Sequence, residues 1–122
     1  MSELLKIAHR GFTKSFLENT LEAFGAAIAG NFEAIELDIQ FSKDGHPIVF
    51  HDENLSRLTA DFAEINDLTL PQLKELRIDK VYSIPTLAEV LEFVGANVIV
   101  IVEIKNPKAV LEVVKQFEKS IK

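Results

Sequence analysis

The stretch Glu33-Ala34-Ile35-Glu36-Leu37-Asp38-Ile39-Gln40-Phe41 decides the fold of this chain. Apolar and polar side chains alternate along it, which predicts a strand with one buried face. The apolar set is Ile35, Leu37, Ile39 and Phe41, and the polar set is Glu36, Asp38 and Gln40. An isolated pair of carboxylates is most simply a solvent-exposed face. The role of Glu36 and Asp38 therefore depends on what the rest of the chain brings to them.

The composition is that of a single globular domain. The chain has 122 residues, of which 48% are hydrophobic, enough for a packed core. Nineteen acidic and thirteen basic residues give a net charge of -6. Lysine and arginine form no stripe, which argues against nucleic acid or an anionic membrane as a partner.

The sequence lacks an apolar membrane span, a signal peptide and cysteine, which limits the cellular compartment and the kinds of metal site to be expected. No apolar window reaches the ~18 residues of a membrane span, and the N-terminus has no signal-peptide pattern, so we expect a cytoplasmic protein. The sequence contains no cysteine. Disulfides and thiolate metal sites are therefore excluded, and any metal must be held by oxygen or imidazole ligands.

Two further strands are predicted, one before the opening stretch in the sequence and one after it. The run 4–11 is short and apolar and stops at a glycine, so His9 stands at the C-terminal end of a strand. The run 97–105 is apolar on both faces, as expected of a central parallel strand covered on both sides. Its only ionisable side chains, Glu103 and Lys105, come at its end.

Helices are predicted between and after these strands. Asn19-Thr20-Leu21-Glu22 is interpreted as a capping box, a short helix is expected at 69–76, and Pro85-Thr86-Leu87-Ala88-Glu89 opens another that Gly95 ends. A last helix follows Asn106-Pro107. Its predicted buried stripe is Val110, Leu111, Val114, Phe117 and Ile121. Strands alternating with helices indicate an α/β fold with parallel strands.

The connection after the opening stretch predicts a β-hairpin. The run 42–47 is too short for a parallel crossover, so the run 48–51 should pair antiparallel with the first strand. With the turn centred on Asp44-Gly45, His51 is expected opposite Asp38. Beyond it, 52–84 is interpreted as a small helical cap, in which Asp52 either orients His51 or merely begins the segment.

Ionisable side chains therefore gather at the ends of several strands. In a (β/α) barrel, such a position indicates an active site. Three carboxylates in one pocket, Glu36, Asp38 and Glu103, need a compensating charge, and a hard divalent cation, Mg²⁺ or Ca²⁺, suits them better than zinc. This cluster predicts a metal site.

Histidines and cations complete the predicted site. His9 and His51 can act as proton donor and acceptor near neutral pH, and Arg10 and Lys105 suit a phosphate. Together these groups favour metal-assisted phosphodiester hydrolysis, in which one histidine activates the attacking hydroxyl or water and the other protonates the leaving alkoxide. Spacing leaves open which histidine takes which role.

At this point the sequence resembles the glycerophosphodiester phosphodiesterases. The ordered motifs that carry the resemblance are His9-Arg10-Gly11, Glu18-Asn19-Thr20, Glu36-Leu37-Asp38, Lys43-Asp44-Gly45, His51-Asp52, Pro85-Thr86-Leu87 and Glu103-Ile104-Lys105. One departure is Arg57-Leu58-Thr59-Ala60, where the family usually has a glycine-containing loop. The resemblance implies a TIM barrel of the phosphatidylinositol phospholipase C-like type that hydrolyses small glycerophosphodiesters to glycerol 3-phosphate and an alcohol.

By position, the resemblance also implies residue roles. Glu36, Asp38 and Glu103 would bind the metal. His9 and His51 would be the catalytic acid/base pair. Arg10 and Lys105 would contact the substrate phosphate.

The length changes the expectation for the fold. A TIM barrel typically takes ~250 residues, so the resemblance implies a partial, half-barrel domain over 1–122, with the hairpin at its mouth and 52–84 as cap. An open half-barrel exposes apolar surface and strand edges, which predicts a homodimer or other self-association. The alternative to a working enzyme is a truncated or engineered half-barrel that assembles and keeps the metal site with little or no activity.

Overall fold

A computed structural model describes residues 4–14 and 16–120. The strands are β1 (Ile7–His9), β2 (Ala34–Phe41), β3 (Pro47–Val49), β4 (Arg77–Ile78), β5 (Tyr82–Ser83) and β6 (Ile99–Glu103). The α-helices are α1 (Leu21–Ala29), α2 (Leu70–Glu75), α3 (Leu87–Val94) and α4 (Val110–Ser120), with short 3-10 helices at Ile65–Asp67 and Pro107–Ala109. No helix in these ranges is long and apolar enough to cross a membrane.

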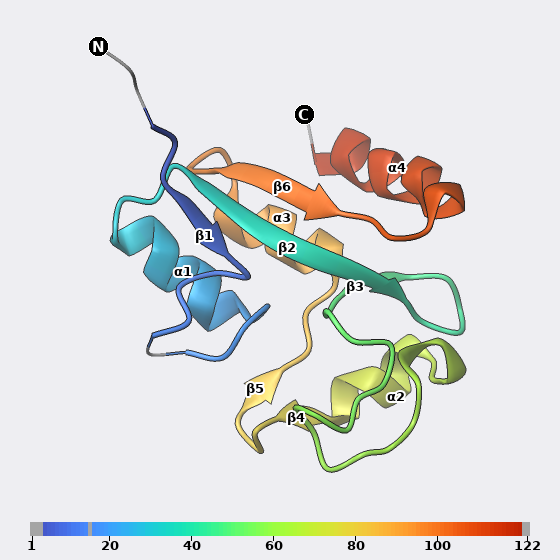
Figure 1. The fold of residues 1–122 in the computed structure, drawn as a ribbon. Coiled ribbons are helices and arrows are strands. Elements are labelled where there is room, and N and C mark those ends of the chain that lie inside the picture. Colours follow the sequence, from blue (N-terminus) through green and yellow to red (C-terminus); the bar gives the residue numbers. More distant parts are fainter. Residues whose placement is uncertain (1–3, 15, 121–122) are drawn as a thin grey trace.

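Strand β2 is the centre of the sheet (Figure 1). It pairs in parallel with β1 on one side and with β6 on the other, and its last residues pair antiparallel with β3. The α/β fold with parallel strands and a hairpin is confirmed, and within the described residues the sheet is open rather than closed into a barrel.

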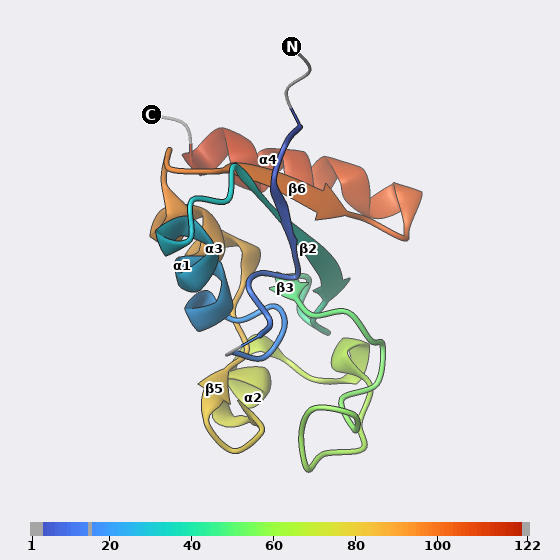
Figure 2. The same ribbon diagram turned by 60° about the vertical axis from the view of Figure 1, so that its left-hand side comes forward.

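One face of the sheet carries the main core. Ile35, Leu37 and Ile39 of β2 point into it, and none is more than 5% exposed. Figure 2 shows α1 and α3 against this face, and the two helices also contact each other. Their core residues are Phe24, Ala27, Leu87, Val90, Leu91 and Val94. The alternation in the opening stretch thus predicted the buried face of β2 correctly.

The opposite face of the sheet is only partly covered. Ile99 and Ile101 of β6 are 54% and 37% exposed, and Ile7 of β1 is 45% exposed. The prediction that 97–105 forms a central strand covered on both sides is therefore wrong for this chain. Within the described residues, β6 pairs only with β2 and lies at an edge. One of its two apolar faces is therefore left partly exposed.

The cap, residues 52–84, surrounds a second apolar core that also takes Ile48 and Phe50 from the β3 arm. The short helix expected at 69–76 is α2, and it begins with a capping box: the Thr69 side chain accepts from Gln72 N while the Gln72 side chain accepts from Thr69 N. Its N-terminus is tied to the hairpin turn, because Leu70 N donates to Asp44 Oδ1 at 3.0 Å. The cap boundaries at 52 and 84 stay a prediction.

The hairpin register differs from the prediction by one residue. Ile39 lies opposite Val49, and Phe50 N donates to Asp38 O at 3.0 Å. Asp38 therefore lies opposite Phe50, not His51. The reason is the loop length, since the five residues 42–46 centre the turn on Asp44 rather than between Asp44 and Gly45.

The predicted start of α1 needs correction. At α1, Thr20 alone caps the helix by accepting from Ala23 N, and no capping box forms with Glu22. The helix start predicted at 85–89 is confirmed, and a capping box forms there between Thr86 and Glu89.

The stripe predicted for α4 is wrong. Ala109 and Val113, four residues apart, face the core and Phe117 packs against it, whereas the other members, Val110, Leu111 and Val114, are exposed. Ile121 lies outside the described residues. The apolar residues of α4 span more of its circumference than the sheet and α3 cover, so periodicity alone could not choose the buried side.

Gly11 is packed closely enough that alanine should destabilise the chain. An added Cβ would lie 2.7 Å from Ala23 Cβ and 2.9 Å from Ala23 C, and φ is +88°. Gly45 has a similar φ of +86° with no atom within 4 Å of an added Cβ. In urea unfolding we expect Gly45→Ala to lose about 1–2 kcal/mol for the backbone alone, and Gly11→Ala about 1–3 kcal/mol more. Equal losses would contradict the packing.

Candidate functional site

Four ionisable side chains meet at the C-terminal edge of the parallel strands. His9 ends β1 and lies beside Glu36 of β2, while Asp38 of β2 lies beside Glu103, which ends β6. Paired residues of parallel strands point to the same side of the sheet. The register therefore places all four on the face opposite the helical core.

Glu36, Asp38 and Glu103 form a compact acidic cluster. One carboxylate oxygen of each lies within 4.8 Å of the others. Asp38 is only 2% exposed, Glu36 is half-buried and Glu103 is exposed. Burial raises the pKa of Glu36, and the neighbouring Glu103 and Asp38 carboxylates reinforce this. The pKa of Glu103 is lowered, first by its hydrogen bond with Glu36.

The cluster fits a hard divalent cation. Glu36 Oε1 and Asp38 Oδ1 are buried and accept no hydrogen bond from the described part of the chain. A buried carboxylate oxygen without a partner is costly unless something compensates it. Carboxylate oxygens are the preferred ligands of Mg²⁺ and Ca²⁺. The donor set and its two unpartnered oxygens therefore suit such an ion.

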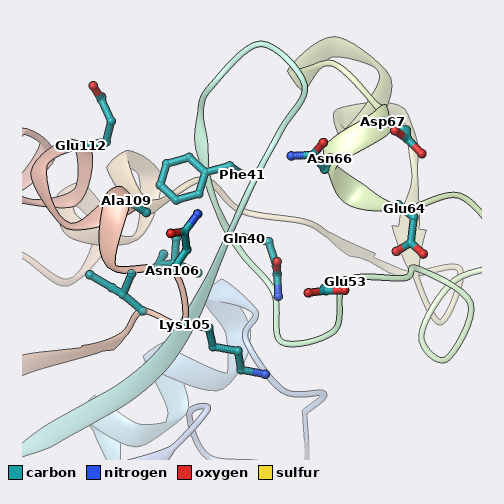
Figure 3. Close-up of a pocket in the computed structure, with 12 residues that line it drawn as sticks. Gln40, Phe41, Glu53, Glu64, Asn66, Asp67, Lys105, Asn106, Ala109 and Glu112 are labelled. Carbon is teal, nitrogen blue, oxygen red and sulfur yellow. The ribbon is translucent and has the colours of Figure 1, made fainter.

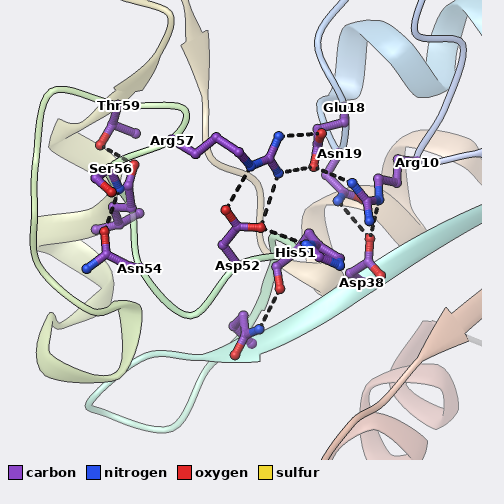
Figure 4. Close-up of polar contacts among 12 residues, drawn as sticks. Arg10, Glu18, Asn19, Asp38, His51, Asp52, Asn54, Ser56, Arg57 and Thr59 are labelled. Atoms are coloured by element: carbon purple, nitrogen blue, oxygen red, sulfur yellow. Dashed lines mark hydrogen bonds and ion pairs between the residues drawn. The ribbon is translucent and has the colours of Figure 1, made fainter.

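The two histidines flank this cluster in different environments. His9 Nε2 lies 3.7 Å from Glu36 Oε1, and the side chain is 70% exposed. His51 is less exposed, and its Nδ1 lies 2.6 Å from Asp52 Oδ1. Gln40 Nε2 donates to His51 O at 2.7 Å, which ties the histidine backbone to β2. Of the two roles considered for Asp52, contact with His51 is the one observed (Figure 4).

The two basic side chains predicted to contact phosphate, Arg10 and Lys105, lie in different environments. Arg10 is held inside the site, with Nε 3.3 Å from Asp38 Oδ2 and Nη1 donating to Glu18 Oε2 at 3.1 Å. Lys105 is exposed and lines a cavity of about 780 Å³. Attraction to Lys105 also contributes to the low pKa of Glu103, after that residue's hydrogen bonds with the other two carboxylates.

The cavity lies where the sheet end, the cap and the segment after β6 meet (Figure 3). Its wall on the sheet side includes Gln40 and Phe41, and the cap contributes several carboxylates. The cap residues are Glu53, Glu64, Asn66 and Asp67. Of the predicted site residues that the structure describes, Lys105 lines this cavity, whereas the three carboxylates of the acidic cluster are not among its lining residues.

Sequence reasoning placed Asn19 in a helix cap and gave it no role in the site, yet it is 1% exposed and donates from Nδ2 to Asp38 Oδ2 at 3.1 Å. Its backbone has φ 56°, a conformation that asparagine tolerates better than most residues. The available signal was the tandem Asn19-Thr20, since two cap-type residues stand where one helix needs only one.

Glu18 and Arg57 were also missed. Arg57 Nη1 and Nη2 donate to the two oxygens of Glu18 at 3.0 and 2.8 Å, across 39 residues of sequence. Local pattern carries no information about a pair so distant. The sequence predicted that His9, Glu36, Asp38 and Glu103 lie together at the strand ends, as they do, but it did not predict the contacts of Asn19, Glu18 and Arg57.

Known proteins resemble this chain in sequence and fold. Residues 9–122 match the glycerophosphoryl diester phosphodiesterase family. A glycerophosphodiester phosphodiesterase from Caldanaerobacter subterraneus subsp. tengcongensis is 41% identical over 110 residues, which cover 84% of this chain and 45% of that protein.

Solved structures of glycerophosphodiester phosphodiesterases have a similar fold. The crystal structure of a glycerophosphodiester phosphodiesterase from Thermotoga maritima superposes with a TM-score of 0.88 at 41% identity, covering 98% of this chain and 51% of that one. A phosphodiesterase from Oleispira antarctica, solved in complex with the product sn-glycerol-3-phosphate, has a TM-score of 0.81 at 32% identity, covering 90% and 51%. The chain spans about half the length of these relatives.

The Asp52 carboxylate should make stability depend on acid pH. Its hydrogen bonds with Arg57, followed by that with His51, lower the pKa to about 2, below the ~3.9 of an unfolded chain. A lowered pKa means that the stabilisation is complete above the unfolded value and is lost as pH falls through the folded one. We expect the difference in unfolding free energy between the parent chain and Asp52→Asn to shrink between about pH 4 and pH 2. A difference that does not change with pH in urea unfolding would contradict this.

Proposed function

Because the chain belongs to the glycerophosphoryl diester phosphodiesterase family, we propose that it carries the site for hydrolysis of small glycerophosphodiesters to glycerol 3-phosphate and an alcohol. The observation that carries the proposal is the cluster of Glu36, Asp38 and Glu103 at the strand ends, with His9 beside Glu36 and His51 near enough to attract Glu103. The product named for the Oleispira antarctica phosphodiesterase supports the same product class here. The proposed domain is 1–122, with 52–84 as cap.

The metal proposal is Mg²⁺ or Ca²⁺ held by Glu36, Asp38 and Glu103. When bound, such an ion supplies positive charge that offsets the three carboxylates and polarises phosphoryl oxygens. Two buried oxygens without hydrogen bonds, on Glu36 and Asp38, support the assignment. These residues are all on β2 and β6, which gives the ligands a rigid base.

The proposed acid and base are His9 and His51. One takes a proton from the attacking hydroxyl or water, and the other gives a proton to the leaving alkoxide. Asp52 is ionised because of its low pKa, so it can only accept a hydrogen bond, and Nδ1 of His51 must donate. This leaves Nε2 of His51 for proton exchange, since each neutral imidazole carries one proton.

Arg10 and Lys105 are the proposed phosphate contacts. Lys105 lines the cavity, where a point charge can meet a phosphate oxygen. Arg10 touches both Asp38 and Glu18, so it also balances negative charge beside the carboxylate cluster. Its cation is thereby held at the edge of the site before substrate enters.

Turnover is tested with glycerophosphocholine, with and without chelator. We expect chelator-sensitive hydrolysis, and a loss of about 100-fold or more in His9→Ala, the scale of general acid–base catalysis. His46→Ala is the matched control, because His46 sits at the hairpin turn near Asp44 and away from the cluster. Equal activity of the two variants would overturn the assignment of His9.

Cation binding is tested separately by thermal unfolding. We expect Ca²⁺ or Mg²⁺ to raise the melting temperature, since a ligand at 100 times its Kd stabilises by about 2.7 kcal/mol. Glu103→Gln should greatly reduce the shift by removing a ligand. Glu92→Gln, an exposed carboxylate on α3, should keep it. A shift that survives in Glu103→Gln would contradict the proposed ligand set.

A second candidate function rests on the open sheet face. Ile7, Ile99 and Ile101 are exposed there, and contiguous apolar surface of this kind favours association. The alternative is a self-assembling half-barrel that binds the cation without turning over substrate. Cation-dependent stabilisation with no hydrolysis would favour it over the enzyme.

Self-association, in the simplest case a homodimer, has its own test. A second copy is proposed to cover the apolar face, so Ile99→Asp should lower the molar mass in light scattering toward that of one chain. Val81→Asp is the control, because Val81 is 66% exposed but belongs to the cap. A parent chain that is monomeric at high concentration contradicts the proposal.

A further inference from the structure

Arg57 stands between two carboxylates that come from different parts of the fold (Figure 4). Its Nε and Nη2 donate to Asp52 Oδ2 and Oδ1 at 2.8 and 3.2 Å. Its Nη1 and Nη2 donate to Glu18 at 3.0 and 2.8 Å. One guanidinium thus makes two forked contacts, a geometry that fixes orientation as well as distance.

The Asp52 arm of this network ends on a proposed catalytic group. Asp52 Oδ1 accepts a hydrogen bond from Arg57 Nη2 and also contacts His51 Nδ1, at 2.6 Å. The other oxygen, Oδ2, is held by Arg57 Nε. With both oxygens engaged, the carboxylate cannot rotate without breaking a charge-assisted contact, and its position determines which imidazole nitrogen keeps the proton.

The Glu18 arm ends on the acidic cluster. Glu18 Oε2 accepts from Arg10 Nη1 at 3.1 Å, and Arg10 Nε lies 3.3 Å from Asp38 Oδ2. The arm begins at the surface and ends at a buried carboxylate: the side chains of Arg57, Glu18, Arg10 and Asp38 are 46%, 14%, 21% and 3% exposed. One arginine of the cap is therefore linked both to the acidic cluster and to His51.

A surface ion pair alone would contribute little, since exposed pairs are typically worth 0–1 kcal/mol. The geometry here differs from such a pair, because both carboxylates are partly buried, 14% exposed for Glu18 and 25% for Asp52, and both are bound by forks. Lysine has one compact ammonium and cannot reproduce two forks on two partners. The arrangement thus requires arginine for its shape and not only for its charge.

We propose that Arg57 is a positioning residue: it holds Asp52 where that carboxylate accepts the Nδ1 proton of His51, so that Nε2 is the nitrogen presented for proton exchange. The inference rests on the proposed catalytic role of His51, while the geometry it predicts for His51 can be measured without turnover. Arg57 touches neither the cluster nor the cavity in this arrangement, and it acts through Asp52.

The tautomer of His51 is the direct readout. The chain is labelled with ¹⁵N-histidine, and long-range ¹H–¹⁵N spectra are recorded at about pH 8, where histidine is neutral. His51→Gln assigns the signal. We expect the Nδ1–H form in the parent chain, and a fall of about tenfold in the ratio of Nδ1–H to Nε2–H in Arg57→Gln. The same ratio should also fall in Arg57→Lys, since lysine keeps the positive charge but cannot make the two forked contacts.

Arg77→Gln is the matched control for removing a cap arginine. Arg77 Nη1 donates only to nearby backbone carbonyls, those of Lys74 and Leu76, each at 2.8 Å. The His51 signal should not change in this variant. Amide spectra of each variant report whether the cap remains folded.

A double-mutant cycle separates positioning from a structural strap. If Arg57 acts through Asp52, Arg57→Gln has no further effect on His51 in an Asp52→Asn background. In turnover of glycerophosphocholine, Arg57→Gln should lose about 10- to 100-fold in kcat with little change in KM. If both Arg57→Gln and Arg57→Lys are folded and His51 keeps the tautomer ratio of the parent chain, the inference is overturned. Absence of turnover in the parent chain counts against the proposed function instead and leaves the tautomer result to decide this one.

Discussion

The pairing of β2 with β1 and β6 is the constraint on which the rest of the structure depends. Parallel register sets Glu36 beside His9 and Asp38 beside Glu103, so that one strand supplies the middle of the candidate site and its neighbours supply the sides. A slip of one residue would turn both β2 carboxylates into the apolar core. The buried face of β2 prevents such a slip, because Ile35 and Leu37 have no exposed surface. The core therefore specifies the position of the chemistry.

The same register concentrates negative charge. Glu36 is half-buried next to two other carboxylates, which raises its pKa and disfavours its charged form. Arg10 and Asn19 offset part of this at Asp38, by an ion pair and a hydrogen bond. Two carboxylate oxygens remain unpartnered within the described residues. A structure that keeps unsatisfied buried acceptors at a strand end gives up stability there, as functional sites commonly do.

Sequence periodicity predicted the parts of this fold that depend on local pattern. The alternation of β2, the caps at Thr69 and Thr86, and the strand ends that carry His9 and Glu103 all follow from neighbours in the chain. The failures have a different origin. The hairpin register depended on one residue of loop length, and the buried side of α4 depended on which surfaces exist to cover it.

The links missed at the site also depend on tertiary structure. Glu18 and Arg57 are 39 residues apart, and only the path of the cap brings them together. Asn19 was interpreted as part of a helix cap because asparagine is a common cap residue, yet Thr20 takes that position and frees Asn19 to reach Asp38. Residues that perform chemistry can be found from type and position at strand ends. Residues that orient them are found only when distant segments meet.

Strand β2 also explains how the cap can matter to the site at all. Its first five residues pair in parallel with β6, and its last three pair antiparallel with β3. The same strand thus carries the carboxylates and begins the hairpin that returns His51 to them. Gln40 Nε2, near the end of β2, donates to His51 O, and Asp44 in the turn holds the start of α2. The cap is therefore connected to His51 through the hairpin as well as through side chains, while Glu36 and Asp38 lie on a strand whose other face is buried in the core. The candidate site combines a rigid half, set by the sheet, with a half whose geometry depends on how the cap is held.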